Sequence, residues 1–427
     1  MTLKHSLRNL SFSIALFISI ISSVLALDPN VQALVDFETL ANKVALRSNE
    51  KVDIEHYEIP LELVGSDIAE RMDQSIKDAL IFKKNGQDYV RWVINPEDTQ
   101  WHLEVKQFLE SKGLDASTHT HLKGYMTASR SYIVEDLTTG AQFSIKVSTN
   151  KTGGHWKNKH QQIQDAKEIR QIAEYVYQEQ QAKPFQNLIT MDEPGIFSLE
   201  ALDQAMVIRT LDGLVGNERI YLPGFSAVHS KTGREIALRN GSTDPEQYWR
   251  ENYNKPLAKA LAELAVRTGL TYDSPHSQNF LIELDSNYRP TGKIVIRDFG
   301  DSYLCKDIVV AKGFPEIPAN WTPKYVKEGV VKITVGIMHG NTYPVWLSDE
   351  KYEQWGEEFF TEYQKEFSRL TGIPKIALKA NNGPNGAYFS GRYKIQGEHW
   401  ETFITQIENE TIQRATHSGP GCRTVFH

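Results

Sequence analysis

The stretch His276-Ser-Gln-Asn279-Phe-Leu-Ile-Glu-Leu284, followed eight residues later by Lys293-Ile-Val-Ile-Arg297-Asp298-Phe-Gly300-Asp301, decides the fold of this chain. It contains two short apolar runs on either side of a polar segment that holds a proline and a glycine. This pattern predicts a β-hairpin. Asn279 precedes the first strand and Asp298 follows the second, so a hairpin would bring both residues to the same end of the sheet.

The two residues at this hairpin end are oxygen ligands of the kind that Mg²⁺ prefers, and Mg²⁺ in proteins often bridges to a nucleotide phosphate. Upstream, residues 126–134 and 142–147 are strand-like runs joined by a polar turn, and the second run contains Lys146. A lysine on a strand can neutralise phosphate charge. The helical pattern of residues 157–181 could offer Glu168 or Glu174 to this lysine. Together these parts predict a site for a nucleotide triphosphate with its metal.

The remaining elements follow from hydrophobic periodicity and turn signals. We expect helices over residues 31–46, 101–111, 248–268 and 352–370, a strand over 205–211, and a hairpin whose turn is Asn85-Gly86.

The composition is that of an ordinary globular protein, with 427 residues, 24% of them charged and 40% hydrophobic. At roughly 100–200 residues per domain the length predicts two or three lobes. The 54 acidic and 47 basic side chains give a formal charge of −7, which argues against a nucleic-acid partner. The only cysteines, Cys305 and Cys422, exclude a disulfide-rich scaffold and cysteine-only metal sites. A disulfide between them and two unpaired thiols both remain open.

The N-terminus has the order of a secretory signal, with Lys4 and Arg8 before an apolar stretch over residues 10–26. Val24 and Ala26 occupy the −3 and −1 positions of a cleavage site, so we expect cleavage near Ala26–Leu27 and a periplasmic or secreted protein. We expect no stable membrane insertion after cleavage. The alternative is an uncleaved anchor helix, because 17 apolar residues are at the lower limit for crossing a bilayer.

The motif His276-Ser-Gln278-Asn279 with Arg297-Asp298-Phe299-Gly300 resembles the His-x-Gln-Asn and Arg-Asp-x-x-Gly pair of the aerobactin-type (IucA/IucC) NRPS-independent siderophore synthetases. The active lobe of that family is itself similar to a protein kinase. The segment Lys123-Gly-Tyr-Met-Thr-Ala-Ser129-Arg130-Ser131 resembles the family's strand that cradles ATP phosphates. The resemblance covers about residues 120–305.

The resemblance implies ATP and Mg²⁺ as cofactors and a set of site residues. Ser129, Arg130 and Lys146 would bind phosphates, and Arg suits this task because its planar fork meets two oxygens at once. His276 and Gln278 would line the nucleotide and acyl-phosphate site, and Asn279 with Asp298 would hold Mg²⁺. The catalytic residues would be His276, Arg130 and Lys146.

The resemblance also implies the reaction, in which a small carboxylate is activated as an acyl-adenylate and passed to an amine or hydroxyl. We therefore expect an α+β fold with a kinase-like, siderophore-synthetase-like ATP-binding lobe, a mixed α/β N-terminal region and a helical C-terminal region. The expected segments are a signal peptide over residues 1–26, an N-terminal region over 27–120, the ATP-binding core over 121–310 and a mostly helical region over 311–427.

A kinase-like phosphotransferase acting on a protein substrate is the second hypothesis. A kinase loop places its base five residues before the Asn, whereas Asp273 lies six residues before Asn279. The glycine-rich phosphate loop is also missing, because no glycine lies between Gly124 and Gly140. A catalytically inactive binding module is the third hypothesis.

Export and ATP chemistry are compatible only in a compartment that contains ATP, such as a secretory lumen or a host cell entered by a secreted effector. They are also compatible if the leader is not cleaved.

Overall fold

The computed structural model describes residues 27–41, 49–127, 130–152, 157–211, 213–216, 218–272, 277–335, 345–374, 378–382, 389–394 and 397–417. These residues form two compact units that interleave along the chain. The first unit contains the N-terminal helix, residues 47–163 and residues 194–217, and the second contains residues 164–193 and the chain from residue 218 onward. The four segments expected from the sequence remain a prediction.

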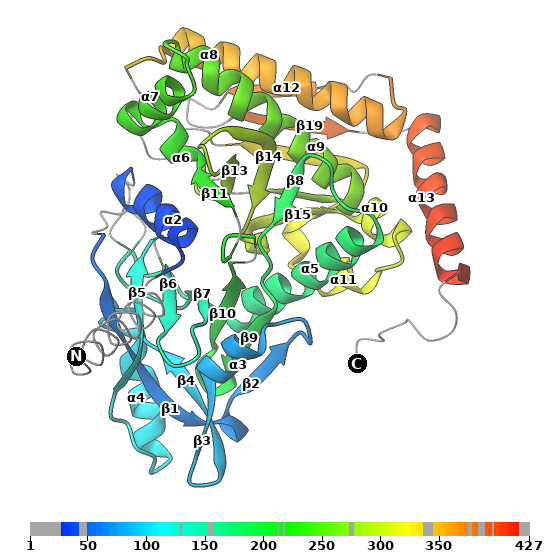
Figure 1. The fold of residues 1–427 in the computed structure, drawn as a ribbon. Helices are drawn as coiled ribbons and strands as arrows, with labels where there is room; N and C mark the ends of the chain where they lie inside the picture. Colours follow the sequence, from blue (N-terminus) through cyan, green and yellow to red (C-terminus); the bar gives the residue numbers. More distant parts are fainter. Residues whose placement is uncertain are drawn as a thin grey trace, which may run out of the picture. The chain divides into compact units, whose positions relative to one another are not determined.

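The first unit is built on a nine-stranded sheet in which all neighbouring strands are antiparallel (Figure 1). In spatial order the strands are β2 Gly65–Ile68, β9 Gly195–Leu199, β10 Gln204–Thr210, β7 Gln142–Lys146, β6 Ser131–Asp136, β5 His119–Met126, β1 Val52–Pro60, β4 Gln87–Val93 and β3 Ile81–Lys84. Its helices are α2 Pro29–Leu40, α3 Gln74–Leu80 and α4 Trp101–Ser111, with the 3-10 turns η1 Leu61–Leu63 and η2 Glu200–Leu202.

The two faces of this sheet differ in chemistry. Alternate residues of the central strands, such as Val134 on β6 and Phe143 and Ile145 on β7, join one apolar core with residues of α3 and α4. Successive side chains of a strand point to opposite faces, so Ser131, Ser144 and Lys146 lie on the other face. Fully burying one large apolar side chain contributes about 1.5–3 kcal/mol, so the apolar face determines how the strands are oriented.

The sequence located the turns of this unit with one error. Asn85 and Gly86 both have positive φ angles, 53° and 83°, as the predicted type I′ turn requires. The expected strand over residues 126–134 is wrong, because β5 ends at Met126 and β6 begins at Ser131. The polar residues Thr127, Arg130 and Ser131 mark this break in the sequence, between the apolar residues on either side.

The second unit contains a four-stranded sheet in the order β11 Arg219–Pro223, β13 Phe280–Asp285, β14 Pro290–Ile296 and β8 Leu188–Thr190. The predicted hairpin is the antiparallel pair β13 and β14, and β8 adds to β14 in parallel. The longer helices are α5 Ile163–Ala182, α7 Ser230–Arg239, α9 Lys255–Thr268, α12 Asp349–Thr371 and α13 Glu398–His417. The α+β class expected from the sequence is confirmed.

The helix predicted over residues 248–268 consists of α8 Pro245–Trp249, the π-helical segment η3 Arg250–Asn254 and α9. Pro256 has no amide hydrogen for an α-helical bond and would clash with the carbonyl four residues earlier, which explains the interruption. α9 packs along α12. Trp355 on α12 also contacts α8 and η3, the two segments that precede α9. Its Nε1 donates to Glu246 Oε1 at 2.8 Å, and its carbonyl accepts from Asn254 Nδ2 at 2.9 Å.

The sequence did not predict the two small sheets of the second unit. One joins β12 Leu270–Tyr272, β15 Ser302–Cys305 and β16 Val326–Lys327, and the other joins β17 Val330–Val335, β19 Phe389–Lys394 and β18 Leu378–Asn382. The remaining elements are α6 Gly224–Ala227, α10 Lys306–Ala311, α11 Glu316–Asn320 and the 3-10 turns η4 Phe299–Asp301 and η5 Pro323–Tyr325.

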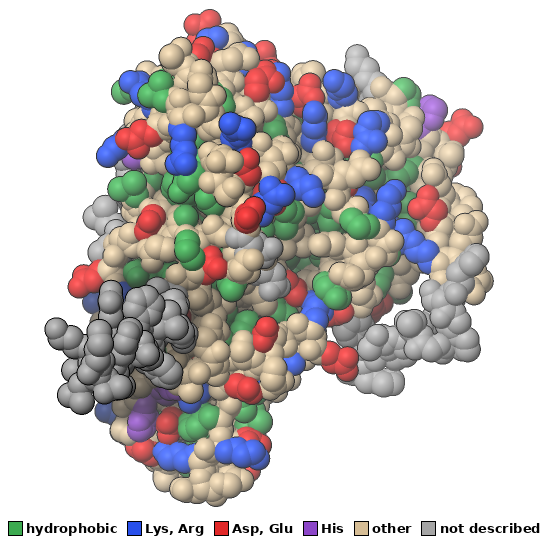
Figure 2. Space-filling model, viewed as in Figure 1, with side chains coloured by type: hydrophobic (Ala, Val, Ile, Leu, Met, Phe, Trp, Pro, Cys, Tyr) green, Lys and Arg blue, Asp and Glu red, His purple; other side chains and the backbone are tan. Residues whose placement is uncertain are grey.

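Figure 2 shows acidic and basic side chains of the described residues intermingled on the visible face.

Of the two cysteines, Cys305 is buried, and Cys422 lies outside the described residues. Within the described ranges no helix is both long enough and apolar enough to cross a membrane. The predicted signal peptide, residues 1–26, also lies outside these ranges.

The stability of the first unit should depend on the protonation of His56, which lies on β1 and is 1% exposed. Its Nδ1 has no hydrogen-bond partner among the described residues. Burial, with the nearby Arg91 guanidinium, lowers the pKa of His56 from 6.5 to about 4. Because the unfolded chain then binds the proton first, the native state loses up to about 3 kcal/mol as the pH falls from 6.5 to 4.

We therefore expect His56→Gln to reduce the pH dependence of the free energy of unfolding in this range. Urea denaturation of both proteins at a series of pH values measures the free energy of unfolding at each pH. The difference between the two proteins removes the contribution of the carboxylates, which both proteins share. Parallel curves for the two proteins would contradict the expectation.

Candidate functional site

The hairpin of the second unit brings three of the predicted site residues together. Phe280 pairs with Ile296 in the β13–β14 register. Beyond this pair, the Arg297 amide donates to the Asn279 carbonyl at 3.2 Å, and Arg297 Nε donates to the Gln278 carbonyl at 2.9 Å. Gln278 and Asn279 therefore lie opposite Arg297 and Asp298 at one end of the hairpin.

Asp298 leaves the strand in an unusual backbone conformation, with φ 66° and ψ 81°. Asp tolerates the left-handed region better than most residues, although the conformation still costs about 1 kcal/mol or more. The following Phe299 is buried. A Cβ atom on Gly300 would come within 2.9 Å of the Ile169 side chain on α5, so only glycine fits there without rearrangement. The Asp-Phe-Gly sequence thus forms a tight turn that packs against α5.

The donors at this hairpin end suit a magnesium ion. Asn279 is 2% exposed, and both it and Asp298 have side-chain oxygens. Within the described residues no group of three or more His, Cys, Asp or Glu side chains is arranged to hold a metal ion. Mg²⁺ is usually bound by one or two protein ligands together with waters and substrate phosphates, so a pair of oxygen donors is sufficient.

The predicted phosphate-binding residues Arg130 and Lys146 belong to the first unit. Their backbones are adjacent, because Ser131 pairs with Lys146 and the Val147 amide donates to the Arg130 carbonyl at 3.3 Å. The Arg130 guanidinium donates through Nη1 to the His160 carbonyl at 2.6 Å. Lys146 is 6% exposed and lies on the polar face of the nine-stranded sheet.

A second buried cation, which the sequence analysis did not single out, lies on the same face. Lys146 pairs with Val207, and Ser144 pairs with Arg209, so Lys146 and Arg209 are diagonal neighbours on β7 and β10. Arg209 is also 6% exposed. The available signal was a charged residue directly after the apolar run of residues 205–208 in the strand. Two buried cations on one sheet face can neutralise a polyanion, because charge interactions are strong where water is excluded.

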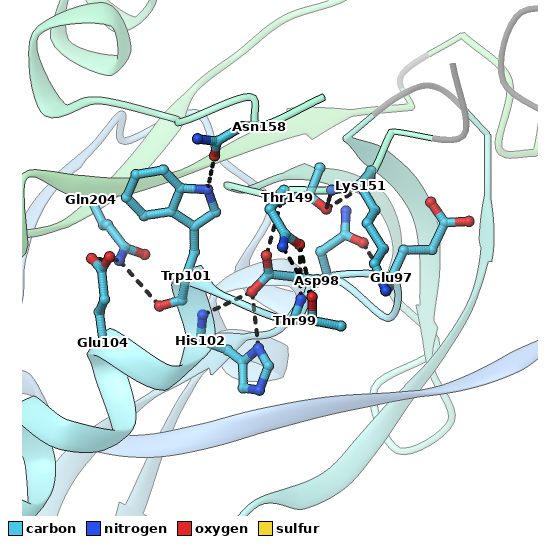
Figure 3. Close-up of polar contacts among 12 residues, drawn as sticks. Glu97, Asp98, Thr99, Trp101, His102, Glu104, Thr149, Lys151, Asn158 and Gln204 are labelled. Atoms are coloured by element: carbon cyan, nitrogen blue, oxygen red, sulfur yellow. Dashed lines mark hydrogen bonds and ion pairs between the residues drawn. The ribbon is translucent and has the colours of Figure 1, made fainter. Parts of the chain in front are cut away.

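The loop after β7 is held by polar contacts around the start of α4, which Figure 3 shows. Asp98 Oδ2 accepts from the His102 amide at 2.8 Å and lies 2.9 Å from His102 Nδ1, and Asp98 Oδ1 accepts from the Asn150 amide at 3.0 Å. Asn150 Oδ1 accepts from the Thr99 amide at 2.9 Å. One buried carboxylate therefore ties the first turn of α4 to the loop that follows Lys146.

The far end of the same loop packs on Trp101. The indole Nε1 donates to Asn158 Oδ1 at 2.8 Å (Figure 3), and its ring stacks on the His160 ring with centroids 4.0 Å apart. Burial lowers the pKa of His160, so this ring stays neutral at neutral pH. Since the His160 carbonyl accepts from Arg130, these contacts also restrict the Arg130 guanidinium.

The two glutamates considered as partners for Lys146 have other contacts in the second unit. Glu168 Oε1 accepts from the Thr322 amide at 2.9 Å and from its hydroxyl at 2.8 Å, and Glu174 lies 3.0 Å from Arg170 Nη1. The remaining predicted site residues, Ser129 and His276, lie outside the described residues.

The fold is similar to that of two solved proteins with low sequence identity. The ATP-bound aerobactin synthetase IucA from Klebsiella pneumoniae matches at 12% identity and a TM-score of 0.50, over 80% of this chain and 69% of IucA. The petrobactin biosynthesis protein AsbB from Bacillus anthracis matches at 10% identity and a TM-score of 0.52, over 89% of this chain and 76% of AsbB. No protein-family model and no curated protein matches the sequence. The similarity confirms, at the level of fold, the resemblance that the motifs predicted.

The loop network gives a test of stability. Asp98→Ala removes the acceptor of two backbone amides, and a buried donor without a partner costs about 1–3 kcal/mol. We expect the free energy of unfolding, measured by urea denaturation, to fall by about 2–4 kcal/mol. Asp88→Ala is the matched control, because Asp88 forms only an exposed 3.5 Å ion pair with Lys83, which contributes about 0–1 kcal/mol. Equal losses in the two variants would contradict the role of Asp98.

Proposed function

We propose, from the fold that this chain shares with the aerobactin-type siderophore synthetases, that it is an ATP-dependent ligase with a kinase-like ATP-binding lobe. It activates a small carboxylate as an acyl-adenylate and transfers the acyl group to an amine or hydroxyl. The observation that carries the proposal is the end of the β13–β14 hairpin, where Asn279 and Asp298 come together in a chain of this fold.

In this proposal the first unit supplies cations for the phosphates. Lys146 and Arg209 are buried on one sheet face, where both positive charges can attract an anion. Arg130 is already oriented by its bond to the His160 carbonyl, and Ser129 next to it supplies a hydroxyl donor. Preorganised donors stabilise developing charge without reorganising during the reaction.

The second unit contains the residues proposed to hold the metal ion. Asn279 and Asp298 would hold Mg²⁺, and the bound ion would neutralise phosphate charge. Gln278 and His276 line the nucleotide and acyl-phosphate site. The substrates are therefore a nucleotide and a small carboxylate. Residues 1–26 direct export, with cleavage near Ala26–Leu27, and ATP chemistry then requires a destination that contains ATP, such as a secretory lumen or a host cell.

Nucleotide binding tests the proposal directly. ATP at a hundredfold excess over its Kd should stabilise the purified full-length chain by about 2.7 kcal/mol, which a thermal shift measures. We expect Lys146→Ala to reduce the shift with and without Mg²⁺, because the lysine contacts phosphate. Asp298→Ala should reduce only the Mg²⁺-dependent part of the shift. A wild-type chain that ATP does not stabilise would exclude every ATP-dependent function.

The products identify the reaction. We expect AMP and pyrophosphate to form from ATP when small carboxylates such as citrate are supplied with an amine, because adenylation releases pyrophosphate. Chromatography of the nucleotides after incubation measures this. ADP with a phosphorylated protein would instead identify a kinase-like phosphotransferase, and ATP binding without turnover would identify an inactive binding module.

A further inference from the structure

Glu193 is a fully buried carboxylate beside the candidate metal ligands, in the connector between β8 and β9. β8 pairs in parallel with β14, with Thr190 opposite Ile296. The pairing continues past the strand end, because the Met191 amide donates to the Ile296 carbonyl at 2.9 Å. Residues 191–193 therefore run beside the segment that leads into Asp298.

Glu193 contacts the turn that contains Asp298. The Phe299 amide, which directly follows Asp298, donates to Glu193 Oε2 at 3.3 Å. Asp298 itself has a left-handed backbone conformation, with φ 66°. Such a conformation persists only when its surroundings hold it, and Glu193 supplies one of the contacts that do so.

We propose that Glu193 is a positioning residue for Asp298. Its carboxylate holds the Phe299 amide and so keeps the Asp298 carboxylate at the hairpin end, beside Asn279. Groups that orient metal ligands change metal affinity by about 10–100-fold when they are removed. The inference rests on the proposed function, in which Asp298 and Asn279 bind Mg²⁺ with ATP.

The chain contains a matched control for this role. Glu263 on α9 is another buried glutamate of the second unit that accepts backbone amides, from Gln186 at 2.8 Å and Asn187 at 2.7 Å. These amides directly precede β8, whereas Glu193 lies beyond its other end. Replacing Glu263 therefore also removes a buried carboxylate that accepts backbone amides, but its amides lie before the start of β8, at the end away from Glu193.

The test compares Glu193→Ala, Glu193→Gln and Glu263→Ala in the full-length chain. Mg²⁺ is titrated at a fixed saturating concentration of ATP, and the melting temperature gives the Mg²⁺ concentration at half-maximal shift. We expect Glu193→Ala to raise this concentration about tenfold or more. Glu193→Gln should stay within about threefold of wild type, because its amide oxygen can still accept the Phe299 hydrogen bond. Glu263→Ala should lower the melting temperature but leave the Mg²⁺ midpoint unchanged.

Two outcomes would overturn the inference while the proposed function stands. One is an Mg²⁺ midpoint of Glu193→Ala that equals that of Glu263→Ala. The other is an equal loss in Glu193→Gln and Glu193→Ala, which would assign the effect to charge and not to the hydrogen bond.

Amide hydrogen exchange at Phe299, measured without nucleotide, separates this inference from the proposed function. Faster exchange in Glu193→Ala but not in Glu193→Gln supports the role of Glu193 in the turn, even if ATP fails to stabilise the wild-type chain. Unchanged exchange in Glu193→Ala overturns that role.

Discussion

The pairing of β13 with β14 is the interaction on which the candidate site depends. Its register puts Asn279 opposite Arg297 and leaves Asp298 at the same end of the hairpin. A slip of one residue would turn every side chain to the opposite face, so the buried apolar residues of both strands protect the register. The parallel addition of β8 then brings Glu193 to the turn after β14. One set of backbone hydrogen bonds thus determines where the backbone places Asn279, Asp298 and Glu193.

The first unit has a different organisation, in which a sheet presents an apolar face to its helices and a polar face with buried cations. Lys146 and Arg209 lie on the polar face, one on each of two neighbouring strands. Burying a cation is unfavourable without a partner, so positions of this kind are retained where they serve binding or are compensated by nearby charges. Arg130, directly before β6, donates to the carbonyl of His160 in the loop after β7, and the His160 ring stacks on Trp101.

The local elements were predictable wherever short-range signals were strong. Asn85-Gly86 formed the expected turn, and α4 has the predicted bounds of residues 101 and 111. The strand expected over residues 126–134 failed because the polar residues Thr127, Arg130 and Ser131, from the end of β5 to the start of β6, were included in it. The π-helical segment before Pro256 was also missed, because periodicity does not distinguish it from a regular α-helix. Prediction therefore failed where a short polar break was read as part of a strand and where the helical pitch changed without a change in hydrophobic pattern.

The sequence by itself determined the hairpin and the presence of Asn279 and Asp298 at its end, because strand propensity and the order of residues are local properties. It also determined that Lys146 lies on a strand. Only the tertiary structure decided that Glu193, more than a hundred residues before Asp298, contacts the turn after it, and that Arg209 shares a sheet face with Lys146. Both depend on which distant strands pair and in which register. That choice results from burying the apolar faces of many strands together, which no local stretch of sequence specifies.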